Sequence, residues 1–153
     1  MPSLTGNKSA LEFDGIDDAV ALPDMGEKQQ VSICFWIQGD GNQSNIIGSD
    51  PTVARQTTFN LLRTARRLQI KRNNYLWMFK DVDFEDNEWT FIVVTADVQA
   101  KQFNVFANGK RCESLFGELV NRVFEPGSSV HPAAWKPISL PHQISGKQPF
   151  KGM

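Results

Sequence analysis

Hydrophobic and polar residues alternate along several short segments of this chain. In segment 31–37 every second side chain is apolar, and these side chains are Val31, Ile33, Phe35 and Ile37. A two-residue period built from β-branched and aromatic residues predicts a β-strand. Segment 89–98 is apolar on both faces. We therefore expect a strand buried on both sides in the middle of a two-sheet sandwich, with Trp89 in the core.

Turn-forming residues separate these segments. The sequence DGIDD at 14–18 carries Gly and Asp between two short apolar runs, which predicts a hairpin or a tight loop. Asn108-Gly109 lies between segments 103–107 and 110–112 and is typical of the type I′ turn of a β-hairpin. Helical periodicity is nearly absent, and only segment 114–124 indicates a short helix.

Length and charge narrow the class of protein. A chain of 153 residues predicts one domain, residues 1–153, that buries about 70% of its unfolded surface. The net charge of −1 gives no global field that would recruit nucleic acid or a membrane, and no run of about 18 apolar residues predicts membrane insertion. Segment 1–10 lacks the basic and apolar regions of a secretory signal. We therefore expect an intracellular protein, unless the chain is a trimmed module of a secreted one.

Neither a disulfide framework nor long regular strands are expected from the cysteines and the C-terminal segment. Two cysteines are too few for a disulfide framework. A Cys34–Cys112 disulfide stays open at this point, but thiols are favoured, because Cys34 lies within a predicted strand and is expected to pack as a small buried hydrophobe. After Phe124 the chain holds five of its eight prolines. We expect long surface loops there, with a short strand near 138–140.

Four pieces in series resemble the laminin-G-like jelly-roll domains of the concanavalin A-like lectin/glucanase superfamily. They are SALEFDGIDDAVALP at 9–23, FWI at 35–37, EWTFIVVTAD at 88–97 and FNVFANGKR at 103–111. The resemblance implies an all-β fold, a two-sheet antiparallel jelly-roll sandwich.

One departure from the family concerns its last strand. Relatives follow "F-x-G" with that strand, whereas this sequence ends at Phe150-Lys151-Gly152-Met153. We therefore expect a fragment or module of a longer protein, or a partner that donates a strand at an open sheet edge.

Asp14, Asp17 and Asp18 in DGIDD form a candidate calcium site. Calcium takes several oxygen ligands, and loops combine carboxylates with backbone carbonyls. The resemblance also implies calcium, because jelly rolls of this superfamily often carry a structural or ligand-bridging ion at a sheet rim. The alternative is turn chemistry, in which the Asp side chains accept hydrogen bonds from backbone amides without an ion.

If these three carboxylates bind calcium, the ion should raise the melting temperature Tm. At a free calcium concentration 100 times the Kd, the folded state should gain about 2.7 kcal/mol, and Tm should rise by roughly 5–10 °C. Magnesium should do much less, because it demands octahedral geometry and releases its waters reluctantly. Asp18→Asn should weaken the response to calcium and leave the apo Tm nearly unchanged, because Asn keeps a turn-forming side chain. Identical melting curves with calcium and with chelator would assign these carboxylates to the turn.

A basic region is the second candidate site. Segment 55–80 contains seven basic residues and no acidic ones, and we take Arg66, Arg67, Lys71 and Arg72 as candidate ligand-binding residues. In RLQIKR at 67–72 the apolar and polar residues alternate, so part of this charge is expected on an exposed strand face that binds a sulfated glycan, a phosphate or an acidic protein. The alternative is a solvated face balanced by the acidic segment 81–88.

Tryptophans and an acidic run complete the candidates. Trp77 and Trp135 have polar neighbours and are the predicted platforms for stacking on a sugar ring. Trp36 lies opposite Phe35 and is expected to line a second interior layer or a concave face. Asp81, Asp83 and Glu85 resemble the "E-x-D-x-E" strand of laminarinase-like glycosidases, whose alternation places two carboxylates on one side of the scissile bond. The alternative interpretation of these acids is an exposed turn.

These observations favour a non-catalytic module that binds a glycan or a protein through a sheet rim or concave face. A structural or protein-interaction subunit of a larger assembly is the alternative, through the basic region and the open sheet edge. A laminarinase-like glycosidase is the third hypothesis. Nucleic acid is excluded as a partner, since no aromatic RNA-binding motif accompanies the basic charge.

Overall fold

The computed structural model describes residues 10–13, 19–23, 25–38, 43–48, 59–64, 67–72, 75–80, 82, 84–85, 87–119, 122–123, 137–139, 143–145 and 150–151. All regular secondary structure in these ranges is β-strand, and every strand pairing is antiparallel. Within these ranges no helix is long and apolar enough to cross a membrane.

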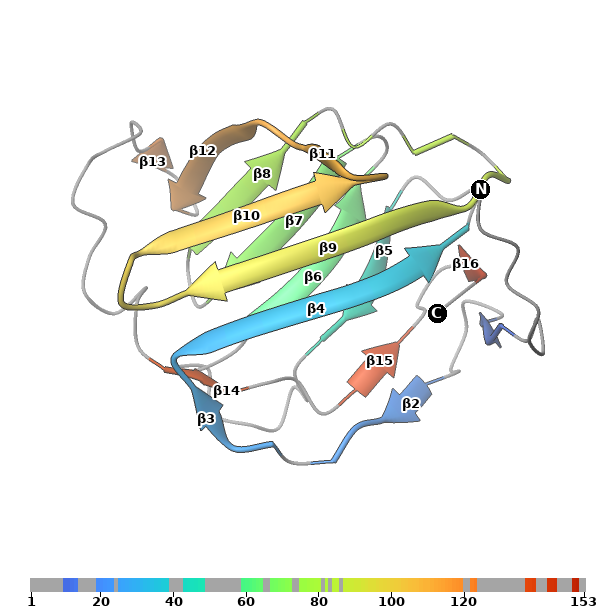
Figure 1. Cartoon of the computed structure of the whole chain (residues 1–153), viewed down its shortest axis with the longest axis horizontal. Helices are drawn as coiled ribbons and strands as arrows, with labels where there is room; N and C mark the ends of the chain where they lie inside the picture. Colours follow the sequence, from blue (N-terminus) through green and yellow to red (C-terminus); the bar gives the residue numbers. More distant parts are fainter. Residues whose placement is uncertain are drawn as a thin grey trace.

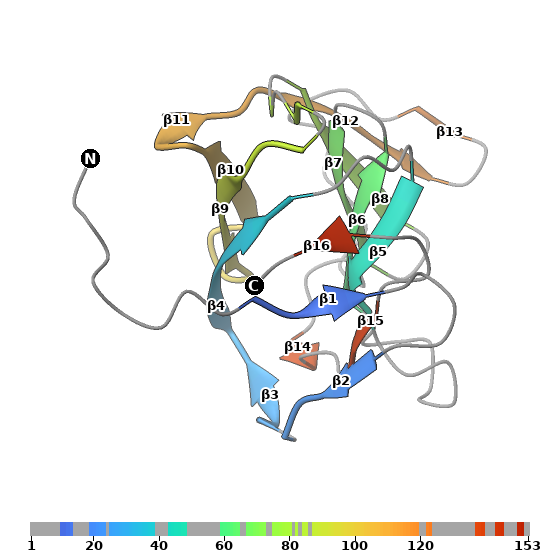
Figure 2. The same ribbon diagram turned by 90° about the vertical axis from the view of Figure 1, so that its right-hand side faces the viewer.

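Two sheets face each other and form an antiparallel jelly-roll sandwich (Figures 1 and 2). The four-stranded sheet has the order β11-β10-β9-β4, with β4 at Gln30–Ile37, β9 at Thr90–Asp97, β10 at Gln102–Ala107 and β11 at Lys110–Arg111. The six-stranded sheet has the order β13-β12-β8-β7-β6-β5. Its strands are β5 (Gln43–Ile47), β6 (Phe59–Thr64), β7 (Arg67–Arg72), β8 (Tyr75–Phe79), β12 (Ser114–Leu119) and β13 (Arg122–Val123).

Three short strand pairs join the beginning of the chain to its end. β1 (Glu12–Phe13) pairs with β16 (Phe150–Lys151), β2 (Ala19–Ala21) with β15 (Gln143–Ser145), and β3 (Glu27–Lys28) with β14 (Ile138–Ser139). The pairings are nested, because the first strand meets the last and the third strand meets the third from the end. Short strands therefore close one side of the sandwich (Figure 2).

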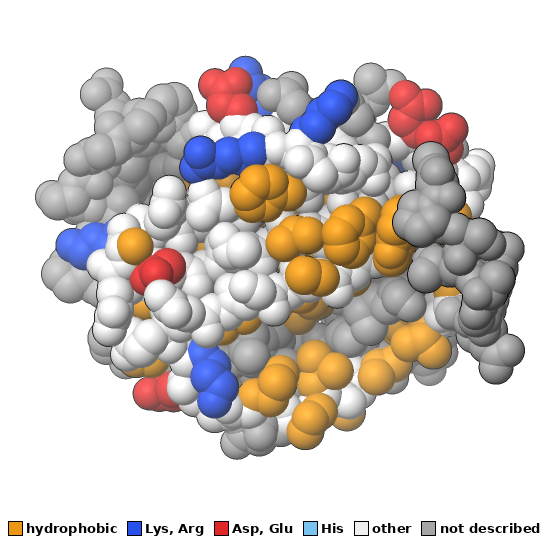
Figure 3. All heavy atoms as spheres, in the orientation of Figure 1, with side chains coloured by type: hydrophobic (Ala, Val, Ile, Leu, Met, Phe, Trp, Pro, Cys, Tyr) orange, Lys and Arg blue, Asp and Glu red, His pale blue; other side chains and the backbone are white. Residues whose placement is uncertain are grey.

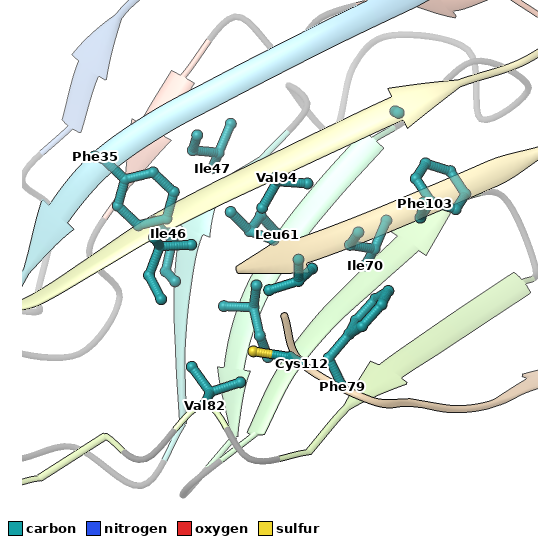
Figure 4. Close-up of a cluster of buried hydrophobic side chains, with 14 of the residues drawn as sticks. Phe35, Ile46, Ile47, Leu61, Ile70, Phe79, Val82, Val94, Phe103 and Cys112 are labelled. Carbon is teal, nitrogen blue, oxygen red and sulfur yellow. The ribbon is translucent and has the colours of Figure 1, made fainter. Parts of the chain in front are cut away.

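Alternating side chains from both sheets form the core between them. The four-stranded sheet contributes Phe35, Val94 and Phe103, and the six-stranded sheet contributes Leu61, Ile70 and Phe79 (Figure 4). Phe103 links the two layers, because its ring centroid lies 6.5 Å from that of Phe59 on β6 and 4.7 Å from that of Trp77 on β8.

Several sequence predictions are confirmed. Segment 31–37 is strand β4, with Phe35 and Ile37 buried and Trp36 on the opposite side. The hairpin of β10 and β11 turns at Asn108 and Gly109, whose φ values of 48° and 82° are those of a type I′ turn. The strand expected near 138–140 is β14, at Ile138–Ser139.

Two predictions about local structure are wrong, and a third is wrong in one of its two alternatives. Segment 114–124 contains the strand β12 where we expected a short helix, because residues 114–119 pair with β8. Of the two structures expected at DGIDD, the hairpin is not formed, because β1 pairs with β16 and β2 with β15; the expected tight loop at 14–18 lies outside the described residues. Finally, β9 is buried on one side only: Ile92 and Val94 are buried, whereas Phe91 and Val93 on its other side are half-buried.

A candidate ligand-binding face on the four-stranded sheet

The outer face of the four-stranded sheet carries apolar side chains that the core does not use. Trp36 pairs with Phe91 across β4 and β9, and Cys34 pairs with Val93, which in turn pairs with Phe106 on β10. We call these five residues the outer aromatic face. Hydrophobic side chains gather on this side of the molecule (Figure 3). The face exists because the end of β4 and the paired start of β9 carry apolar side chains on both sides, and only one side can meet the other sheet.

An aromatic pair dominates this face. The ring centroids of Trp36 and Phe91 are 5.1 Å apart, and the planes are inclined by 36°. The side chain of Trp36 is 45% exposed, and Trp89, the residue before β9, is 42% exposed. A tilted aromatic pair holds its rings in place, so Trp36 presents an ordered, solvent-exposed apolar surface.

Polar groups adjoin the aromatic side chains on β10 and β11. Arg111 pairs directly with Phe106 in the strand register. Its Nη2 donates a hydrogen bond of 2.7 Å to Oδ1 of Asn104, and Nδ2 of Asn104 donates one of 3.2 Å to Oγ1 of Thr95. This chain of hydrogen bonds fixes the guanidinium and the amide beside the aromatic side chains. Both groups keep further donors, because a guanidinium has five N–H groups and an amide has two.

Asp97 closes the opposite end of the same face. Its Oδ1 accepts a hydrogen bond of 2.8 Å from the backbone N of Ala100, and its Oδ2 accepts one of 2.7 Å from Nε2 of Gln30. The Ala100 amide first, and the Gln30 amide second, lower the pKa of Asp97, because both donate to its ionised form. The carboxylate is therefore ionised at neutral pH, and it serves the turn that follows β9.

Trp77 does not form an exposed platform. It pairs with Ile70 in the strand register and therefore shares the inner face of the six-stranded sheet. The side chain is partly buried and packs against the core, with Phe103 as its ring partner. The direction of the Trp77 side chain is set by its position in the alternation along β8, and not by the polar residues that precede it in sequence. Trp135 lies outside the described residues.

The predicted basic face divides between the two sides of β7. Arg67 and Lys71 are exposed on the outer side. Arg72 is fully buried on the inner side, where its Nη2 donates a hydrogen bond of 2.9 Å to the carbonyl of Pro137. Burial lowers the pKa of Arg72 to about 10, so it is still a cation at neutral pH. The prediction that Arg72 shares an exposed basic face is therefore wrong, and Arg66 lies outside the described residues.

The acidic candidates are only partly described. Asp14, Asp17 and Asp18 lie outside the described residues, as do Asp81 and Asp83. Among the residues that the structure does describe, no three His, Cys, Asp or Glu residues lie close enough together to hold a metal ion.

Glu85 lies in a turn and not on a strand. It is exposed, and its carbonyl accepts a hydrogen bond of 3.3 Å from the backbone N of Glu88. The described part of segment 81–88 therefore does not provide the strand that the glycosidase hypothesis requires.

Sequence reasoning missed the outer aromatic face. It placed Trp89 in the core and treated Cys34 as buried, and both side chains are exposed. The cysteines form no disulfide with each other, as expected. Alternation already separated Trp36 from Phe35, and it separated Phe91 from Ile92. Because Trp36 and Phe91 are as apolar as Phe35 and Ile92, alternation did not show that Trp36 and Phe91 belong to a solvent-facing surface.

The match to a family model agrees with this architecture. The family model of the concanavalin A-like lectin/glucanases superfamily matches residues 14–153. No curated protein matches the chain. The structure is similar to the CBM40 of Ruminococcus gnavus IT-sialidase bound to alpha2,3 sialyllactose, with a TM-score of 0.47 and 14% identity over 93% of this chain and 90% of that chain. For the same CBM40 bound to alpha2,6 sialyllactose, the TM-score is 0.37 and the identity 14% over 89% of each chain. The family match covers most of the chain, which therefore belongs to the concanavalin A-like lectin/glucanases superfamily.

Proposed function

We propose that this chain is a non-catalytic carbohydrate-binding module that holds a glycan on its outer aromatic face. The observation that carries the proposal is the exposed Trp36 ring, held by Phe91 at 5.1 Å. The apolar C–H face of a sugar ring packs on an aromatic surface, whereas its hydroxyl groups need donors and acceptors at the margin. The outer aromatic face offers the apolar surface, and Asn104 and Arg111 beside it offer the hydrogen-bonding groups.

The neighbouring polar groups support a sugar in preference to a purely apolar ligand. Arg111 and Asn104 are fixed by their mutual hydrogen bond beside Phe106. Neither side chain has to be ordered when a ligand arrives, so the entropy cost of forming hydrogen bonds to hydroxyl groups is low. Ligand-binding sites commonly place a few polar groups, such as an amide or a charged side chain, beside apolar and aromatic ones.

Replacing Trp36 with alanine is expected to weaken glycan binding by about 2 kcal/mol, which is about thirtyfold in Kd. Fold stability should change little, because the ring is 45% exposed on the outer face. A glycan array should first identify the ligand, with calcium and with chelator, and calorimetry should then compare the variants.

Lys71→Ala is the matched control, because Lys71 is exposed on the outer side of the other sheet. It should leave Kd unchanged. If Lys71→Ala weakens glycan binding and Trp36→Ala does not, the glycan binds at the basic face of β7 and the assignment to the outer aromatic face is wrong. If the array shows no binding in either condition, the glycan proposal is wrong.

A further inference from the structure

Among the described strands, β4 forms an open edge of the four-stranded sheet. It pairs with β9 on one side over residues 30–37 without a bulge, and it is the lower strand of that sheet in Figure 1. Its eight residues, QVSICFWI, include no charge and no proline. Natural edge strands usually carry charges, prolines or bulges that prevent pairing with another chain. β4 has none of these protections.

The direction of the backbone groups along β4 follows from one hydrogen bond. The backbone N of Val98 donates to the carbonyl of Gln29 at 2.9 Å, so Gln29 directs its backbone groups toward β9. In an antiparallel strand, the backbone N–H and C=O groups of successive residues point alternately to the two neighbouring sides. The N–H and C=O groups that point to the open edge therefore belong to Gln30, Ser32, Cys34 and Trp36.

The side chains of β4 also indicate incomplete coverage. On the inner face Phe35 and Ile37 are buried, whereas Val31 and Ile33 are only partly buried although they pack against the core. Val31 and Ile33 would therefore bury additional apolar surface if another strand paired with β4, and this burial is favourable.

We propose that β4 pairs antiparallel with β4 of a second copy of this chain, so that two four-stranded sheets become one continuous sheet. A two-fold axis requires that the same residues meet in both directions. With the axis at Cys34, Ser32 meets Trp36 of the second copy. Ser32, Cys34 and Trp36 of each copy then direct their backbone N–H and C=O groups toward the other copy, and their side chains lie on the outer face.

This register also matches the inner face. Val31 meets Ile37 of the second copy and Ile33 meets its Phe35, so every apolar inner side chain meets another apolar one. A shift of the axis to Ile33 would place Ile37 opposite Gln29. A copy of the chain fits this edge because β4 carries no charge to repel itself.

The proposal predicts a concentration-dependent dimer, measured by sedimentation equilibrium. Ser32→Pro should yield a monomer, because its N–H points to the open edge and its loss removes no hydrogen bond to β9. Ser32→Ala keeps the N–H and should remain dimeric. If Ser32→Pro does not fold, Ser32→Lys places a charge at the same point of the edge and should also yield a monomer.

A disulfide between the two Cys34 side chains tests the proposed register of the β4–β4 pair. In this pairing the two Cys34 Cα atoms lie about 5.5 Å apart, within the range of a disulfide. Added diamide should accept two protons and two electrons from the paired thiols and cross-link the wild-type dimer. Cys34→Ser should dimerise without cross-linking, because Cys112 is buried. A wild-type monomer at every concentration, or a dimer that Ser32→Pro leaves intact, would overturn the proposal, and a dimer without the Cys34 cross-link would overturn this register.

Discussion

Replacing Phe103 with alanine is expected to lower the free energy of unfolding by about 3–5 kcal/mol, the usual cost of removing a buried phenylalanine. Phe103 is 8% exposed and lies between the sheets. Its ring packs against Phe59 on β6 and Trp77 on β8, so truncation leaves a cavity at the point where β10 meets the other sheet. Urea denaturation of the variant and the wild type measures the loss.

Phe106→Ala is the control for that experiment. Phe106 is on the same strand but on the outer face, where it is half-buried. Its removal should cost less than half as much stability, because no closed cavity forms. It should weaken glycan binding instead. Equal losses of stability for the two variants would contradict the assignment of inner and outer faces on β10.

Replacing Arg72 with alanine is expected to cost about 2–4 kcal/mol. The variant loses the charge-assisted hydrogen bond to the Pro137 carbonyl, which joins β7 to the segment entering β14. It also loses the packing of a long side chain that is fully buried. Urea denaturation should therefore show a clear loss, and a change below about 0.5 kcal/mol, the scale of ordinary surface substitutions, would contradict the burial of Arg72.

Arg72→Met separates the charge from the packing. Methionine keeps most of the apolar volume and removes the cation, which burial already disfavours by lowering the pKa of Arg72 to about 10. Replacing a buried charge with an apolar side chain of similar size is often neutral. The Met variant should therefore be more stable than the Ala variant. If the two are equally unstable, the guanidinium itself, and not the volume, holds this part of the fold.

Much of the fold was predictable from sequence, because strand patterns and turn chemistry are local. Alternation identified β4, and the Asn-Gly pair identified the hairpin of β10 and β11. The family resemblance supplied the sandwich. The helix expected at 114–124 failed because pairing with β8 outweighed a weak helical pattern in β12.

The candidate site was less predictable, because which face of a sheet meets solvent is a tertiary property. Trp36 and Phe91 are as apolar as their buried neighbours, so sequence could not assign them to an outer surface. Arg72 is different: alternation in RLQIKR places it with Leu68 and Ile70 on the buried side, whereas its charge favours an exposed position. Alternation was the better guide there, since a strand fixes side-chain direction whatever the residue type.

The nested pairing of the chain's ends affects the order in which the protein folds during synthesis. β1, β2 and β3 are synthesised before the other described strands, whereas their partners β16, β15 and β14 are synthesised after them. Contacts between residues so far apart in sequence form slowly, because a long loop has to close first. β1, β2 and β3 therefore stay without their partners until the rest of this domain has been synthesised, and unpaired strands are exposed to aggregation. Pairing of Phe13 with Phe150 is expected among the last steps of folding.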